Sequence, residues 1–144
     1  MTHWVNHYLR ARYRDGARGE IAPDGVPEFD CWGLARWVRF AQCGKRLLPS
    51  WGHVRNTMPR VFTRAYRAEA ASMEECAPEA GAVAVVYRGA LVVHVAVVIE
   101  VDGRLAALEI NQGTGVRWRR IADFEAPYLR VAYYRDRPNL PEQT

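Results

Sequence analysis

Lysine is almost missing from this chain of 144 residues, in which Lys45 is the single example and arginine supplies nearly all of the positive charge. The formal net charge is +4, and the arginines are scattered along the sequence instead of forming one basic run. Nucleic-acid-binding domains concentrate Lys and Arg on one face or one helix. The sequence therefore predicts no nucleic-acid partner, although a mildly basic surface suits an anionic polymer.

Cysteine is also scarce. Cys31, Cys43 and Cys76 show neither a CxxC pair nor the Cys/His spacing of a zinc site, so we expect no metal. Cys31 and Cys43 lie twelve residues apart on one expected helix, which is too far for a disulfide. Free thiols are therefore expected, as in a reducing compartment.

Long apolar runs are missing as well. The longest, from Ala90 to Val101, contains His94 and Glu100 and is too short to cross a bilayer. The first residues lack the apolar core of a signal peptide. We therefore expect no membrane partner and no signal peptide. The length fits one domain, and the sequence contains no internal repeats.

The first half of the chain has the apolar periodicity of helices. We expect helices over residues 2–13, 31–43 and 59–71, a loop over 15–28, and irregular chain over 45–56. Thr2, Asp30 and Thr57 are the expected N-caps of these helices, and Gly44 suits the position just after the second.

The second half is rich in valine and turn residues, which predicts strands over 81–87, 91–101, 104–111, 116–118 and 128–135. Asp102-Gly103 is a strong hairpin signal between the second and third of these strands. The predicted fold is α+β, with N-terminal helices packed on a five-stranded, mostly antiparallel sheet. Residues 1–135 would form a single domain, and 136–144, with two prolines, a flexible tail.

Cys31 is the first candidate for chemistry. It follows the expected N-cap Asp30, in a helical first turn whose free N–H groups and dipole favour a thiolate. The alternative interpretation is a small buried cysteine on the core face of an amphipathic helix.

His94 is the second candidate, because it interrupts a run that otherwise reads as a strand buried on both faces. An imidazole there must be paired or line a cavity. Glu109 and Asn111 alternate with apolar residues on the next strand, and either could orient the imidazole as it takes a proton from Cys31. The alternatives are a histidine bonded to a backbone carbonyl, and two polar residues on a solvent face.

Several segments of the chain resemble those of a known family. The segment from Phe29 to Arg36, reading FDCWGLAR, closely resembles the nucleophile motif of NlpC-like cysteine peptidases, in the form carried by tailed phages and gene transfer agents. The resemblance continues in the segments LPSW at 48–51, HVAVVI at 94–99, GTGV at 113–116 and VAYYR at 131–135.

The resemblance implies a papain-like fold in which Cys31 is the nucleophile and His94 the general base, with no metal or cofactor. Glu109 stands where members usually carry His, Asn or Gln, and Asn111 is the alternative third residue. Substrate-binding residues are then Tyr13, beside the oxyanion site, together with Asp30, Trp32 and Trp51.

The implied activity is hydrolysis of amide bonds in peptidoglycan stem peptides, typically at a D-glutamyl linkage. The expected partners are stem peptides and other tail-tip or hub proteins, in a phage-like virion tail tip made in the bacterial cytoplasm. Two alternatives stay open: a tail component that keeps the fold without catalysis, and an amidase or acyltransferase on the same scaffold.

Overall fold

The computed structural model describes residues 3–52 and 54–138. In chain order its elements are η1 (Trp4–His7), β1 (Arg12–Tyr13), β2 (Arg18–Ile21), β3 (Pro27–Phe29), α1 (Cys31–Ala41), α2 (Pro59–Ala70), β4 (Met73–Cys76), β5 (Val83–Arg88), β6 (Leu91–Val101), β7 (Arg104–Asn111), β8 (Gly115–Arg120), α3 (Ile121–Glu125) and β9 (Arg130–Asp136). The α+β class is therefore confirmed. No helix among the described residues has the length and apolar character needed to cross a bilayer.

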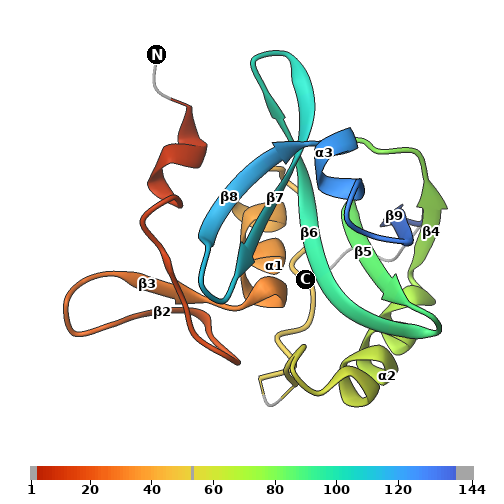
Figure 1. Ribbon diagram of the computed structural model, residues 1–144, viewed down its shortest axis with the longest axis horizontal. Coiled ribbons are helices and arrows are strands. Elements are labelled where there is room, and N and C mark those ends of the chain that lie inside the picture. The colour runs from red at the N-terminus through yellow and green to blue at the C-terminus, as the bar shows by residue number, and fades with distance from the viewer. Residues whose placement is uncertain (1–2, 53, 139–144) are drawn as a thin grey trace.

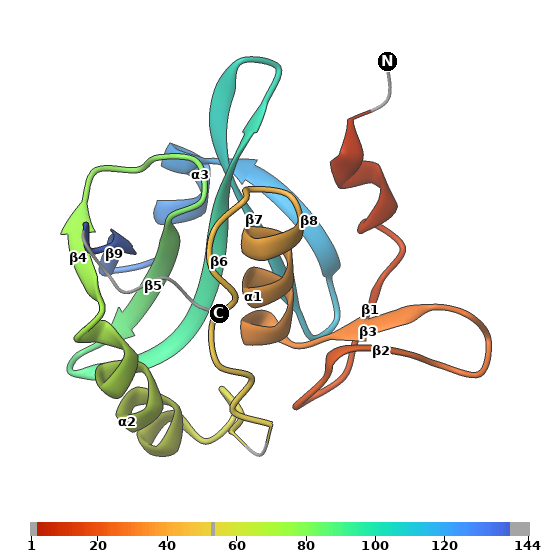
Figure 2. The same ribbon diagram turned by 180° about the vertical axis from the view of Figure 1, so that it is seen from behind.

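The main sheet has six strands in the order β4-β9-β5-β6-β7-β8, and all of its neighbours are antiparallel. Helices α1 and α2 cover one face, and the short α3 lies on the other (Figures 1 and 2). Because side chains alternate across a strand, β5 sends Val83 and Val85 to the α1 side and Ala84 and Val86 to the α3 side. Burial on both faces explains the near-continuous valine runs.

The sheet differs from the predicted five strands in three ways. β4 was not predicted, since its residues read MEEC and lack a β signal. β8 extends to Arg120, two residues past the predicted end, and runs directly into α3. β9 ends at Asp136, one residue past the predicted strand, and most of the tail predicted over 136–144 lies outside the described residues.

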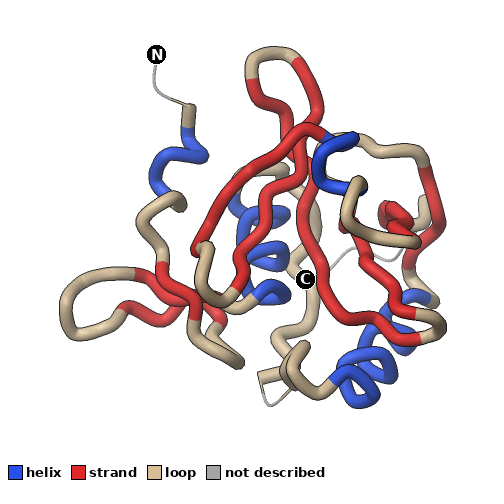
Figure 3. Tube along the Cα trace, in the orientation of Figure 1, coloured by secondary structure: helices blue, strands red, loops and turns tan. Residues whose placement is uncertain are grey.

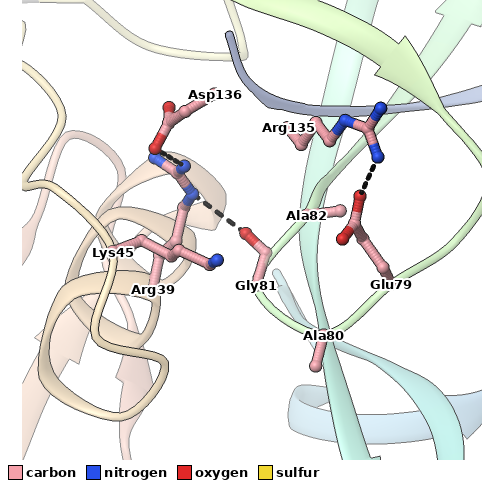
Figure 4. Close-up of a pocket in the computed structure, with 8 residues that line it drawn as sticks. All are labelled: Arg39, Lys45, Glu79, Ala80, Gly81, Ala82, Arg135 and Asp136. Atoms are coloured by element: carbon pink, nitrogen blue, oxygen red, sulfur yellow. Dashed lines mark hydrogen bonds and ion pairs between the residues drawn. The ribbon is translucent and has the colours of Figure 1, made fainter. Parts of the chain in front are cut away.

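Asp136 is held in place by buried charge. It pairs with Arg39 of α1 at 2.6 Å and with Arg46 at 2.9 Å. Arg39 also donates from Nε to the carbonyl of Gly81 at 2.9 Å, so its guanidinium joins α1 to both β9 and the turn before β5 (Figure 4). This network fixes the far end of α1 on the sheet.

The N-terminal region is also different from its prediction. Instead of a helix over 2–13, the chain makes a single 3-10 turn, η1, whose N-cap is His3; Thr2 lies outside the described residues. Instead of a loop, residues 15–28 contain a β2–β3 hairpin, which with β1 makes a separate three-stranded sheet (Figure 3). Pairing of β1 with β3 is favoured over a short isolated helix, because the pairing satisfies backbone N–H and C=O groups that such a helix leaves without partners.

The predicted helix at Cys31 is confirmed, with Asp30 as its N-cap. It ends at Ala41, and Gly44 follows with the left-handed φ of 67° expected after a helix. Gly33 is required by close packing, since a Cβ at this position would lie 2.3 Å from the backbone oxygen of Ala17.

Helix α2 is confirmed within one residue at its end, but its predicted cap is wrong. Met58 occupies the N-cap position without a side-chain hydrogen bond. The Thr57 hydroxyl donates instead to Asp15 Oδ2 at 2.9 Å, which ties the start of α2 to the N-terminal region.

Candidate functional site

Asp30 fixes the start of α1 and is completely engaged in doing so. One carboxylate oxygen accepts from the Gly33 amide at 2.8 Å, and the other accepts from the Gly16 amide at 3.1 Å and pairs with Arg18 at 2.7 Å. Burial raises the pKa of Asp30, and Arg18 opposes that rise. With 1% of its surface exposed, Asp30 is the N-cap of α1 and directly precedes Cys31.

Cys31 lies at the first position of α1 with only 2% of its surface exposed. Burial raises the pKa of its thiol far above the ordinary value, and the nearby Asp30 carboxylate raises it further. The backbone amides of Val95 and Trp32 favour the thiolate but are outweighed. The thiolate expected from the helix dipole is therefore not the resting state, because burial of the sulfur costs more than the dipole supplies.

His94 and Glu109 form a buried polar contact within the sheet. His94 Nε2 lies 2.9 Å from Glu109 Oε1, between strands β6 and β7, and both side chains are buried. Asn111 donates to the same Glu109 oxygen at 3.1 Å. Of the two predicted orienting residues, Glu109 thus contacts the imidazole, while Asn111 contacts Glu109.

The second oxygen of Glu109 faces two arginines of β8. Arg117 Nε lies 3.1 Å from Oε2, and Arg119 Nη2 lies 3.0 Å from it. Burial alone would raise the pKa of Glu109, but the hydrogen bond and charge of His94, with the two arginines, lower it to about 2. Glu109 is therefore an anion across the physiological range. The arginine pair is a part of the site that the sequence did not reveal.

Cys31 and His94 are neighbours that do not touch. No hydrogen bond joins them among the described residues, although the Val95 amide, next to His94, acts on the Cys31 sulfur. The register pairs His94 with Val86, on the α3 side of the sheet, whereas Cys31 packs in the α1-side core. The two halves of the predicted dyad are adjacent but not assembled.

The separation has a visible structural origin. The ladder between β6 and β7 ends at Val97 and Leu108, although both strands continue past that point. Figure 1 shows β6 and β7 diverging below their crossing, with α1 behind them. The His94–Glu109 contact lies in this divergent part, beyond the last paired residues of the two strands.

Tyr13 also reaches the site. Its hydroxyl lies 3.4 Å from Asn56 Oδ1 and 3.5 Å from Asp15 Oδ1, and Asn56 Nδ2 donates to the Val93 carbonyl at 3.4 Å. Burial raises the pKa of Tyr13 to about 12, with Asp15 and Cys31 adding to the rise. Tyr13 therefore stays a neutral donor close to the thiol. Asn56 carries no sequence signal that could have identified it.

Trp32 and Trp51 stack with ring centroids 3.9 Å apart. Trp32 is a core residue, 1% exposed, whose indole N–H donates to the Pro49 carbonyl at 2.9 Å. Trp51 is half-buried and adopts a left-handed φ of 49°, which is rare for a bulky residue. Only Trp51 of the pair can present an aromatic edge to a ligand.

Arg18 holds the strained Trp51 segment in place. Its guanidinium donates to the carbonyls of Ser50 at 2.6 Å, Trp51 at 3.1 Å and Val54 at 2.7 Å, while it pairs with Asp30. One buried cation therefore couples the start of the Cys31 helix to the loop that carries Trp51. Sequence reasoning missed Arg18 because it lies in the segment predicted as a loop.

Within the described ranges, no three His, Cys, Asp or Glu side chains converge in a way that could hold a metal ion. Comparisons with protein-family models, with curated proteins and with solved structures gave no match to this chain.

Proposed function

We propose that this chain is an NlpC-like cysteine peptidase with a papain-like fold, which hydrolyses peptidoglycan stem peptides at a D-glutamyl linkage in a phage-like tail tip. The observation that carries the proposal is the buried His94–Glu109 hydrogen bond of 2.9 Å beside the N-terminus of the Cys31 helix. A histidine oriented by a permanent anion is the arrangement that a thiol nucleophile needs.

In the proposed mechanism, Glu109 occupies Nε2 of His94, so Nδ1 is the nitrogen left to receive the Cys31 proton. The thiolate attacks the carbonyl carbon of the scissile amide, and the imidazolium returns the proton to the leaving amine. Water then hydrolyses the thioester. The Cys31 amide and the Tyr13 hydroxyl are the donors proposed for the oxyanion.

The mechanism requires a shift that brings the Cys31 sulfur to His94 Nδ1. We place that shift at the divergence of β6 and β7, and we assign substrate binding as its trigger. A substrate that displaces solvent and opens the Cys31 side of the site can use its binding energy for this rearrangement.

A second candidate is a non-catalytic tail-tip or hub component with the same fold. The observation that favours it is the buried, protonated Cys31 without a hydrogen bond to His94. In that case Glu109 and its arginines serve to stabilise the sheet, and the partners are the neighbouring tail proteins.

The deciding experiment is digestion of purified peptidoglycan sacculi, with mass spectrometry of the soluble products. Catalysis predicts release of stem-peptide fragments by the wild type, loss of release in Cys31→Ala and in His94→Ala, and full activity in the matched Cys43→Ala control. Fragments cut between sugar and peptide would identify an amidase instead. A folded wild-type protein that releases nothing supports the structural component.

A further inference from the structure

The outer face of α2 carries a row of three exposed arginines, Arg60, Arg64 and Arg67. Their spacing of four and three residues places them on one side of the helix, over about 10 Å of its length. Together with Thr63, Ala90 and Leu91 they line an open surface hollow of about 370 Å³. We call this set the arginine row.

The arginine row has no acidic counterpart among the described residues. None of its three guanidinium groups takes part in an ion pair there, and the helix's own Glu69 pairs with Arg46. Arg67 makes one hydrogen bond, to the Ala90 carbonyl at 3.3 Å. Like charges at these spacings repel one another, so an anion bound in the hollow lowers the electrostatic repulsion among the three arginines.

The hollow lies next to the strand that carries His94. Thr63 Oγ1 accepts from the Val92 amide at 2.8 Å, and Asn56 donates to the Val93 carbonyl, so the start of α2 is fixed to β6 just before His94. Leu91, which lines the hollow, is three residues from His94, or about 10 Å along an extended strand. A ligand chain of a few residues spans that distance.

The chemistry of the lining selects the ligand. Arginine forks bind carboxylates and phosphates in the same bidentate way. Single-stranded nucleic acid additionally needs aromatic side chains on which bases stack, and the hollow's lining contains none. Carboxylates on a flexible chain therefore fit better than a nucleic-acid backbone.

We infer that the arginine row is a carboxylate-binding subsite that anchors the wall peptide while another part of it reaches Cys31 and His94. This inference rests on the proposed function, because it takes the stem peptide as the ligand. Exposed arginine–carboxylate contacts are individually weak, so the row acts through three of them together.

The test measures binding without hydrolysis, in the Cys31→Ala background, by co-sedimentation with intact sacculi. Replacing the row by R60Q/R64Q/R67Q is expected to weaken binding about ten-fold, since three exposed pairs of about 0.5 kcal/mol give that factor. The matched control R104Q/R130Q/R137Q removes the same charge from exposed arginines elsewhere and is expected to bind like the parent. Sacculi whose carboxyl groups are blocked by amidation should bind the parent as weakly as the row variant binds untreated sacculi.

Three results would overturn the inference. Unchanged binding in the row variant removes the subsite, and an equal loss in the control variant reduces the effect to net charge. Row-dependent binding of single-stranded DNA that exceeds binding to sacculi replaces the wall peptide by nucleic acid. Failure of the proposed function looks different, because the wild type then releases no fragments while row-dependent binding persists.

Discussion

His94 Nε2 and Glu109 Oε1 lie 2.9 Å apart in the interior of the protein, on two strands whose ladder has already ended. The contact therefore does not follow from sheet pairing and is made by the side chains themselves. Asn111, Arg117 and Arg119 converge on the same carboxylate, so the imidazole is held against an anion that is fixed from three further directions.

Replacing Glu109 by Gln should lower kcat for stem-peptide hydrolysis by up to about 10⁴-fold, the loss seen when the carboxylate that orients a catalytic histidine is replaced by an amide. The amide keeps the shape but removes the charge that stabilises the imidazolium. Glu100→Gln is the matched control, because Glu100 lies on β6 with an exposed side chain. Thermal unfolding first confirms that both purified variants are folded. Their hydrolysis rates are then compared to check the prediction. An E109Q enzyme as fast as E100Q contradicts an orienting role.

Glu109 should also make the protein sensitive to acid. Its pKa is lowered in the folded state to about 2 from an unfolded value near 4.5, so its carboxylate stabilises the fold above pH 4.5. That contribution falls as the pH drops from about 4.5 to 2, because the unfolded chain takes up the proton first. Urea unfolding at successive pH values should show a steeper loss of stability in the wild type than in E109Q. Parallel curves for the two proteins would assign acid sensitivity to other groups.

Cys31 should react slowly with iodoacetamide in the free protein, since burial protonates and covers the thiol. In a Cys43→Ser/Cys76→Ser background, we expect labelling of Cys31 to be slower than that of free cysteine at pH 7 and to accelerate when a stem-peptide fragment is added. Mass spectrometry of quenched samples follows the reaction. Fast labelling without ligand would show that the resting site is already open. Protection by the fragment would contradict a ligand-triggered opening.

Asp136→Asn should destabilise the fold by about 3 kcal/mol, because it leaves the buried Arg39 without its anionic partner. Arg39 is completely buried, whereas Asp136 lies at the end of β9. Asp102→Asn provides the control, as Asp102 is exposed in a turn whose left-handed φ asparagine also adopts. Urea midpoints of both variants decide the matter. Equal midpoints would place residue 136 in the frayed tail that its sequence suggests.

The sequence by itself determined the elements whose signals are local. The 31–41 helix has its cap, its amphipathic stripe and its terminating glycine within a few residues, and the 91–111 hairpin has a valine-rich first strand followed by Asp102-Gly103. The same hairpin brings His94, Glu109 and Asn111 to one end of the sheet, but its register would place Asn111 level with His94, so the contact with Glu109 is made by the side chains and not by the local signal. Local periodicity and turn chemistry suffice for the helix and the hairpin.

Only the tertiary structure decided the rest. Strand β4 forms because it pairs with the distant β9, and β1 because it pairs with β3 across the intervening β2, contacts that no local pattern encodes. The state of Cys31 was decided in the same way: its position at a helix N-terminus favours a thiolate, but packing against β6 buries the sulfur and reverses that preference. Burial is a property of the whole fold, so the charge of a buried thiol cannot be read from its neighbours in sequence.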